Sequence, residues 1–134
     1  MTSIRAWLAG VVVVVGAAPA LAHHSFAAFD RSREVTLTGV VREFQWVNPH
    51  AWVQVIVTDE KGRQTEWGLE CGSPNMMART GWRRTTLKPG DRVVAVANPL
   101  KDGKPNASLV RITLPDGRVL GPGDAPAPRP LRSR

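Results

Sequence analysis

The sequence predicts an all-β fold with small α content, arranged as a five-stranded barrel in the order β-β-β-α-β-β. Two observations carry this prediction. Five runs of alternating apolar and polar residues are separated by turn residues, and one helical segment lies between the third and fourth runs. A closed barrel is favoured over an open sheet because closure leaves few strand edges unpaired.

The first expected strand is long, covering residues 34–47, and it changes phase along its length. Aliphatic residues occupy one face in its first half, whereas Phe44 and Trp46 occupy the opposite phase in its second half. A change of phase after Gly39 is what a bulge or bend in a strongly curved strand produces. An Asn-Pro pair then forces a turn.

The second and third strands are expected at residues 51–58 and 63–71, joined by a hairpin turn at residues 59–62. In the third strand, Trp67 and Cys71 fall in the phase that faces the interior. We therefore expect Cys71 to be a small buried apolar residue rather than a ligand or a nucleophile.

A short helix is expected at residues 75–80. Ser73 suits its N-cap and Pro74 its first position, and Gly81 suits the left-handed residue that ends it. Trp82, just beyond the helix, is expected to fold back onto the core.

The fourth and fifth strands are expected at residues 92–97 and 107–114, separated by a polar hairpin loop at residues 98–106. A turn follows at residues 115–118. This order, with a long bent first strand, is typical of the oligonucleotide/oligosaccharide-binding (OB) barrel. A two-sheet sandwich is the alternative, but five strands and a mid-chain helix fit it less well.

The chain begins with the pattern of a secretory signal peptide at residues 1–22. Arg5 precedes an apolar run, which Pro19 breaks, and a small-x-small triplet ends at Ala22. Cleavage there makes His23 the first residue of the mature protein. We therefore expect a soluble periplasmic or secreted protein, with no transmembrane segment after cleavage.

Three further regions are expected: an N-terminal arm at residues 23–33, an OB-like barrel at residues 34–120 and a disordered tail at residues 121–134, rich in Pro and Arg. Phe26 and Phe29 are expected to pin the arm to the barrel. The single cysteine excludes an internal disulfide, so the core alone must stabilise the fold.

Loss of Arg5 with the signal peptide lowers the formal net charge from +7 to +6. In an exported protein this charge argues for anionic polysaccharide or an acidic periplasmic protein as the partner and against nucleic acid. The alternative is that the charge only keeps the protein soluble.

Several motifs together resemble an uncharacterised family of short exported bacterial proteins, a domain of unknown function. The motifs are AHHSF at residues 22–26, the segment containing NPH at residues 35–55, GSPNM at residues 72–76, GW at residues 81–82, LKPGD at residues 87–91 and SLVRITLPDGR at residues 108–118. The resemblance implies a periplasmic, single-domain β protein, and it implies no activity, substrate or catalytic residue.

The three histidines, His23, His24 and His50, are the candidate metal ligands. After cleavage, His23 offers an α-amine and an imidazole Nδ1, which together can chelate one metal ion. A third nitrogen from His50, or from His24 in its place, would complete the nitrogen set that suits Cu(II). The alternative is that the first two are polar residues on the arm and that His50 is a turn residue. Met76 and Met77 are more simply read as core residues than as Cu(I) ligands.

Tryptophans on the first strands give the second hypothesis, a metal-free module that binds a partner protein or a saccharide through an aromatic strand face. Trp46 and Trp52 are its candidate residues, with Arg42, Gln54 and Glu66 beside them. Trp67 and Trp82 are expected in the core instead.

No catalytic motif is recognisable, so the chain is interpreted as a non-enzymatic binding protein. A metalloenzyme with an open copper position is a third class, but the sequence does not identify a substrate surface for it.

Overall fold

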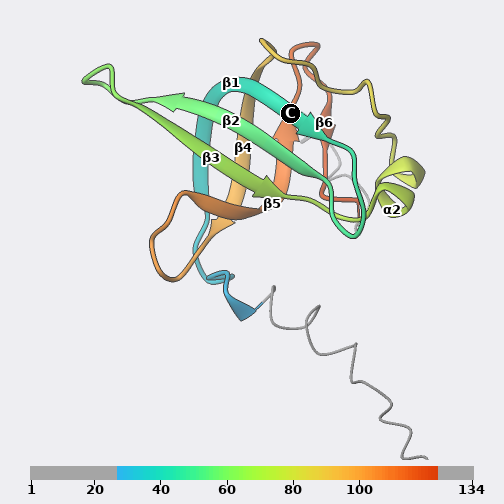
Figure 1. The fold of residues 1–134 in the computed structure, drawn as a ribbon, viewed down its shortest axis with the longest axis horizontal. Helices are drawn as coiled ribbons and strands as arrows, with labels where there is room; N and C mark the ends of the chain where they lie inside the picture. Colours follow the sequence, from blue (N-terminus) through green and yellow to red (C-terminus); the bar gives the residue numbers. More distant parts are fainter. Residues whose placement is uncertain (1–26, 124–134) are drawn as a thin grey trace, which may run out of the picture.

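Residues 27–123, the part of the chain that the computed structural model describes, form a closed barrel of five strands with a sixth short strand at its side (Figure 1). The elements are β1 (Val35–Gln45), β2 (Trp52–Thr58), β3 (Gln64–Glu70), α2 (Pro74–Arg79), β4 (Arg92–Pro99), β5 (Asn106–Thr113) and β6 (Val119–Leu120). The predicted all-β fold class and the order β-β-β-α-β-β are confirmed, and β6 is an addition to the predicted order.

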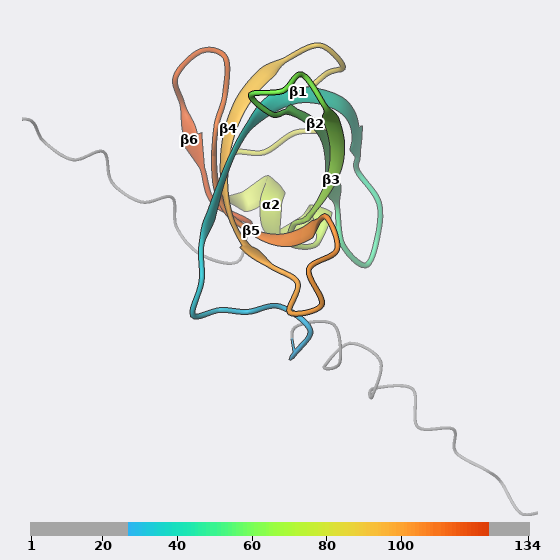
Figure 2. The same ribbon diagram turned by 90° about the vertical axis from the view of Figure 1, so that its left-hand side faces the viewer.

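The barrel closes through a parallel pairing between β3 and β5. Antiparallel pairings join β3 to β2, β2 to β1, β1 to β4 and β4 to β5. Residues 68–70 of β3 then pair with residues 106–108 of β5 and complete the ring. Figure 2 looks along the barrel, with the strands encircling its interior and α2 at one end.

The long first strand serves two sides of the barrel because it bends at Gly39. A Cβ at this position would lie 2.4 Å from the carbonyl oxygen of Ile56 and 2.6 Å from Cγ1 of Val55, so only glycine allows this approach to β2. The expected phase change follows as a bulge, with the register of β1 against β2 shifting between Val41 and Glu43.

The core is formed by the inward phase of each strand and is closed at one end by α2. Trp82, Met77 and Leu69 are among its largest fully buried side chains. The indole Nε1 of Trp82 donates to the carbonyl oxygen of Gly121 at 2.8 Å, which satisfies its one polar group inside the core. The predicted packing of Trp82 on the core is confirmed.

Helix α2 lies one residue before its expected bounds of 75–80, but the residues predicted to begin and end it are confirmed. The side-chain oxygen of Ser73 accepts a hydrogen bond from the backbone N–H of Met76, and Gly81 follows the helix with a φ of 99°. The prediction that both methionines are core residues is wrong for Met76, which is 42% exposed, whereas Met77 is fully buried. Adjacent helical residues point about 100° apart, so one narrow contact face holds only one of them.

The ends of the described chain pack on the barrel. Phe29 is 5% exposed and pairs with Leu100, so the arm is pinned there as expected. At the other end, the backbone N–H of Gly72 donates to the carbonyl oxygen of Pro122 at 2.6 Å. The expected signal peptide, His23, His24, Phe26 and residues 124–134 of the expected tail lie outside the described residues.

Replacing Gly39 with alanine is expected to destabilise the fold by about 1–3 kcal/mol, because the new Cβ meets backbone atoms of β2 that cannot move alone. Urea denaturation followed by circular dichroism measures this loss. A Gly39→Ala variant as stable as the parent protein would show that β1 does not need this close approach.

Candidate binding site on the outer face of β2, β3 and β5

Six residues form two rows on the outer face of the barrel where β2, β3 and β5 lie side by side. Because directly paired residues point to the same face of a sheet, the strand registers place their side chains together. We call this set the outer-face patch: Trp52, Glu70 and Ser108 form its first row, and Gln54, Gly68 and Asn106 form its second.

Glu70 is the unusual member of the patch because it points away from the core and is nevertheless buried. Its side chain is 6% exposed, and its Oε1 lies 2.8 Å from Nδ1 of His50, whose side chain is 22% exposed. A buried carboxylate is costly unless it is hydrogen-bonded, and His50 supplies that bond. His50 is therefore oriented by Glu70 as well as by the turn that precedes β2.

The second row brings two carboxamide groups together over a glycine. A Cβ on Gly68 would lie 2.3 Å from Oδ1 of Asn106 and 3.3 Å from Oε1 of Gln54. Within residues 27–123, neither side-chain amide has a hydrogen-bond partner. The absence of a side chain at Gly68 thus creates the space into which both groups converge.

The residues expected to form an aromatic strand face are separated in the structure. Trp52 points outward from β2, but Trp46 packs on the core side against Phe44, with ring centroids 5.6 Å apart. Arg42 forms an ion pair with Glu66, which lies four residue pairs along β2 and β3 from Trp52. Trp52 with its polar neighbours is therefore the part of the expected face that the structure brings together.

Sequence reasoning missed the part that Glu70 and Asn106 play. The expected hairpin turn at residues 59–62 would pair residue 58 with residue 63 and so place residue 52 opposite residue 69. The structure pairs Thr58 with Gln64 instead, and this shift of one residue sets Glu70 opposite Trp52. Asn106 has no comparable local signal, since its place over Gly68 depends on a pairing between strands distant in sequence.

Of the three candidate metal ligands, only His50 lies within the described residues. His50 lies beside Glu70, whereas His23 and His24 are outside the described residues. Within residues 27–123, no three His, Cys, Asp or Glu side chains gather into a group that could hold a metal ion. The same part of the chain contains no helix long and apolar enough to cross a membrane.

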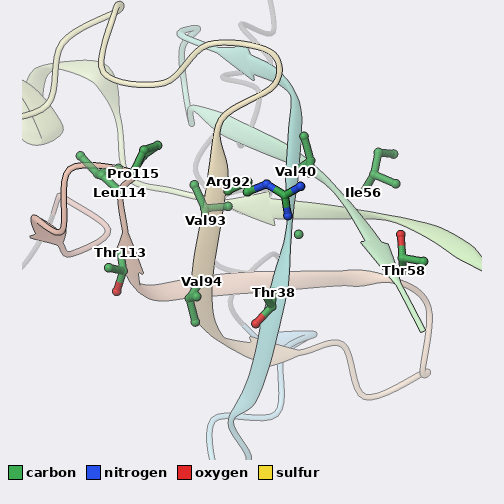
Figure 3. A pocket seen from close by; sticks show the side chains of 11 residues that line it. Thr38, Val40, Ile56, Thr58, Arg92, Val93, Val94, Thr113, Leu114 and Pro115 are labelled. Atoms are coloured by element: carbon green, nitrogen blue, oxygen red, sulfur yellow. The ribbon is translucent and has the colours of Figure 1, made fainter. Parts of the chain in front are cut away.

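A shallow groove of about 590 Å³ lies elsewhere, over the bend of β1 (Figure 3). Val40, Ile56 and Arg92 line it, and Arg92 lies beside Val40, its partner in the pairing of β1 with β4. None of the candidate metal ligands or outer-face patch residues contributes to this groove.

Residues 10–109 of the chain match the family described as "Family of unknown function (DUF6152)", which confirms the resemblance seen in the motifs. None of the curated proteins matches the chain. Among solved structures, the mitochondrial single-stranded DNA binding protein Rim1 from S. cerevisiae is similar, with a TM-score of 0.46 and 13% sequence identity. The similarity covers 61% of this chain and 92% of that one.

Cys71 is a core residue beside this site, not a member of it. Burial, with a smaller contribution from the charge of Glu70, raises the pKa of its thiol far above the ordinary value. The predicted burial is confirmed.

We expect Cys71 in the folded protein to resist iodoacetamide at pH 8 and to react readily in 8 M urea, because only the thiolate attacks and burial disfavours it. Mass spectrometry after timed exposure measures the modified fraction. Rapid modification of the folded protein would contradict the buried, protonated thiol.

Proposed function

We propose that this chain, which belongs to the DUF6152 family, is an exported, non-enzymatic periplasmic binding protein that holds Cu(II) through His23 and His50. The observation that supports this proposal best is the contact between His50 and the buried carboxylate of Glu70. Copper is the metal proposed because nitrogen ligands bind Cu(II) most strongly among the divalent first-row ions.

The contact with Glu70 prepares His50 to bind a metal. A carboxylate oxygen only accepts hydrogen bonds, so Nδ1 of His50 carries a proton in this contact, and Nε2 is the ring nitrogen that this proposal assigns to the metal. A carboxylate behind a histidine in this way fixes the tautomer and the ring orientation of metal-binding histidines in general. This is the chemistry expected of a ligand and is more than a turn residue requires.

His23 contributes the other two nitrogens in this proposal. When Ala22 is removed, the α-amine and Nδ1 of His23 belong to one residue and can close a chelate ring on the metal. The pKa of an α-amine is near 8, so a metal ion displaces its proton easily near neutral pH. His24 is the residue that would replace His50 if the arm were placed differently.

The arm is anchored next to β5. The backbone N–H of Lys101 donates to the carbonyl oxygen of Ala28 at 3.0 Å, and that of Leu100 donates to the carbonyl oxygen of Asn106 at 3.0 Å. The proposal requires that the four residues from Ala27 back to His23, which span at most about 14 Å when extended, bring His23 to His50.

A second candidate function is a metal-free module that binds a partner protein or a saccharide through its aromatic strand face. The observation that favours it is the outward position of Trp52 between Gln45 of β1 and Glu70 of β3. An indole with polar neighbours on both sides is a common element of binding surfaces.

The copper proposal predicts that the correctly processed protein binds Cu(II) tightly and that one extra glycine before His23 weakens binding strongly. The added residue separates the α-amine from the imidazole and destroys the chelate ring. Isothermal titration calorimetry at pH 7 measures both affinities. Equal binding by the two forms would remove His23 from the site.

The role of His50 is tested by comparing His50→Ala with His24→Ala, a matched loss of one imidazole. We expect the first variant to lose more Cu(II) affinity than the second, and Glu70→Gln to lose about 10- to 100-fold because it no longer orients His50 as a carboxylate does. Circular dichroism checks that each variant is folded. A larger loss in His24→Ala would assign the third nitrogen to His24.

A further inference from the structure

We propose that the outer-face patch binds an uncharged saccharide, with Trp52 as the platform on which one sugar ring stacks. This inference deepens the second candidate function and rests on it, and it does not depend on copper. Three features of the patch each restrict the class of ligand that it can bind.

The first feature is the pair of converging amides. Gln54 and Asn106 direct their side chains over Gly68, and within the described residues their amides have no hydrogen-bond partner. A carboxamide offers both a donor and an acceptor, and so does each hydroxyl group of a sugar. Two such groups at one point can hold adjacent hydroxyls of one ring.

The second feature is the position of Trp52 relative to these amides. Trp52 is paired with Glu70 in the row next to Gln54 and Gly68, so the indole and the amides are about one row apart on the same face. Its side chain is partly exposed, unlike the inward-facing residues on either side of it, which are fully buried. An aromatic face beside fixed polar groups provides apolar contact and orientation together.

The third feature is the charge around the patch. Glu43 of β1 is paired with Gln54, so its carboxylate lies beside the second row of the patch. Glu70 lies in the first row but is buried and hydrogen-bonded to His50, and Arg42 is paired with Glu66. The carboxylate of Glu43 disfavours phosphate and uronate groups at the second row. This feature argues for an uncharged saccharide over an anionic polysaccharide or a nucleic acid strand.

The test uses protein kept free of metal with EDTA, so that failure of the copper proposal cannot affect it. Intrinsic tryptophan fluorescence and calorimetry measure binding of cellohexaose and chitohexaose as uncharged probes, with hexagalacturonate and a dodecamer of deoxythymidine as anionic ones. We expect at least one uncharged probe to bind and both anionic probes to bind more weakly or not at all.

Four variants assign the binding to the patch. Trp52→Ala is expected to weaken it at least about tenfold, and Asn106→Ala about three- to tenfold. Gly68→Ala is expected to weaken it as well, because the new Cβ displaces the Asn106 side chain while the fold, checked by circular dichroism, is retained. Gln54→Ala is expected to weaken binding about as much as Asn106→Ala, and its matched control is Gln64→Ala, an exposed glutamine on β3 away from the patch.

The outcomes separate the alternatives. Tighter binding of hexagalacturonate or of the deoxythymidine strand would overturn the proposal in favour of an anionic ligand. Binding of neither uncharged probe would also overturn it, as would binding that Trp52→Ala and Gly68→Ala leave unchanged. Copper binding by the same preparation is measured separately, after EDTA has been removed.

Discussion

The parallel pairing of β3 with β5 is the contact on which the rest of this structure depends. It closes the barrel, so that no long strand edge is exposed along the ring. It also sets Ser108 beside Glu70 and Asn106 over Gly68. The closure of the barrel and the β5 side of the outer-face patch thus depend on the same three residue pairs.

Glu70 connects this closure to both proposed functions. A carboxylate on the outer face of an open sheet would be solvated, but here it is almost fully buried and is hydrogen-bonded to His50. The same side chain lies in the first row of the outer-face patch, next to Trp52. A copper ion held by His50 would therefore lie close to whatever molecule stacks on that indole.

Patterns that are local in sequence predicted most of the fold. Alternation located the five strands of the barrel, Ser73 and Gly81 marked the limits of the helix, and the phase change in β1 indicated its bulge. The short β6 carries too few residues to show alternation, so it was not predicted. Met76 was misassigned because a six-residue helix has only a narrow buried face.

The candidate site was less accessible to sequence reasoning. His50 and Trp52 can be singled out in the sequence by residue type. The residues that form the site with them, however, lie on β3 and β5. The expected hairpin turn is one residue too short to pair Trp52 with Glu70, and Asn106 depends on a crossover between strands about 40 residues apart. Trp46 and Trp52 share a place on the first strands, but the bulge in β1 turns Trp46 towards the core.

The copper proposal is tested most directly by a crystal structure of the processed, Cu(II)-loaded protein with anomalous data at the copper edge. The account predicts one anomalous peak in contact with the α-amine and Nδ1 of His23 and with Nε2 of His50, with Glu70 still bound to Nδ1 of His50. A peak away from His50, or a first residue other than His23, would contradict it.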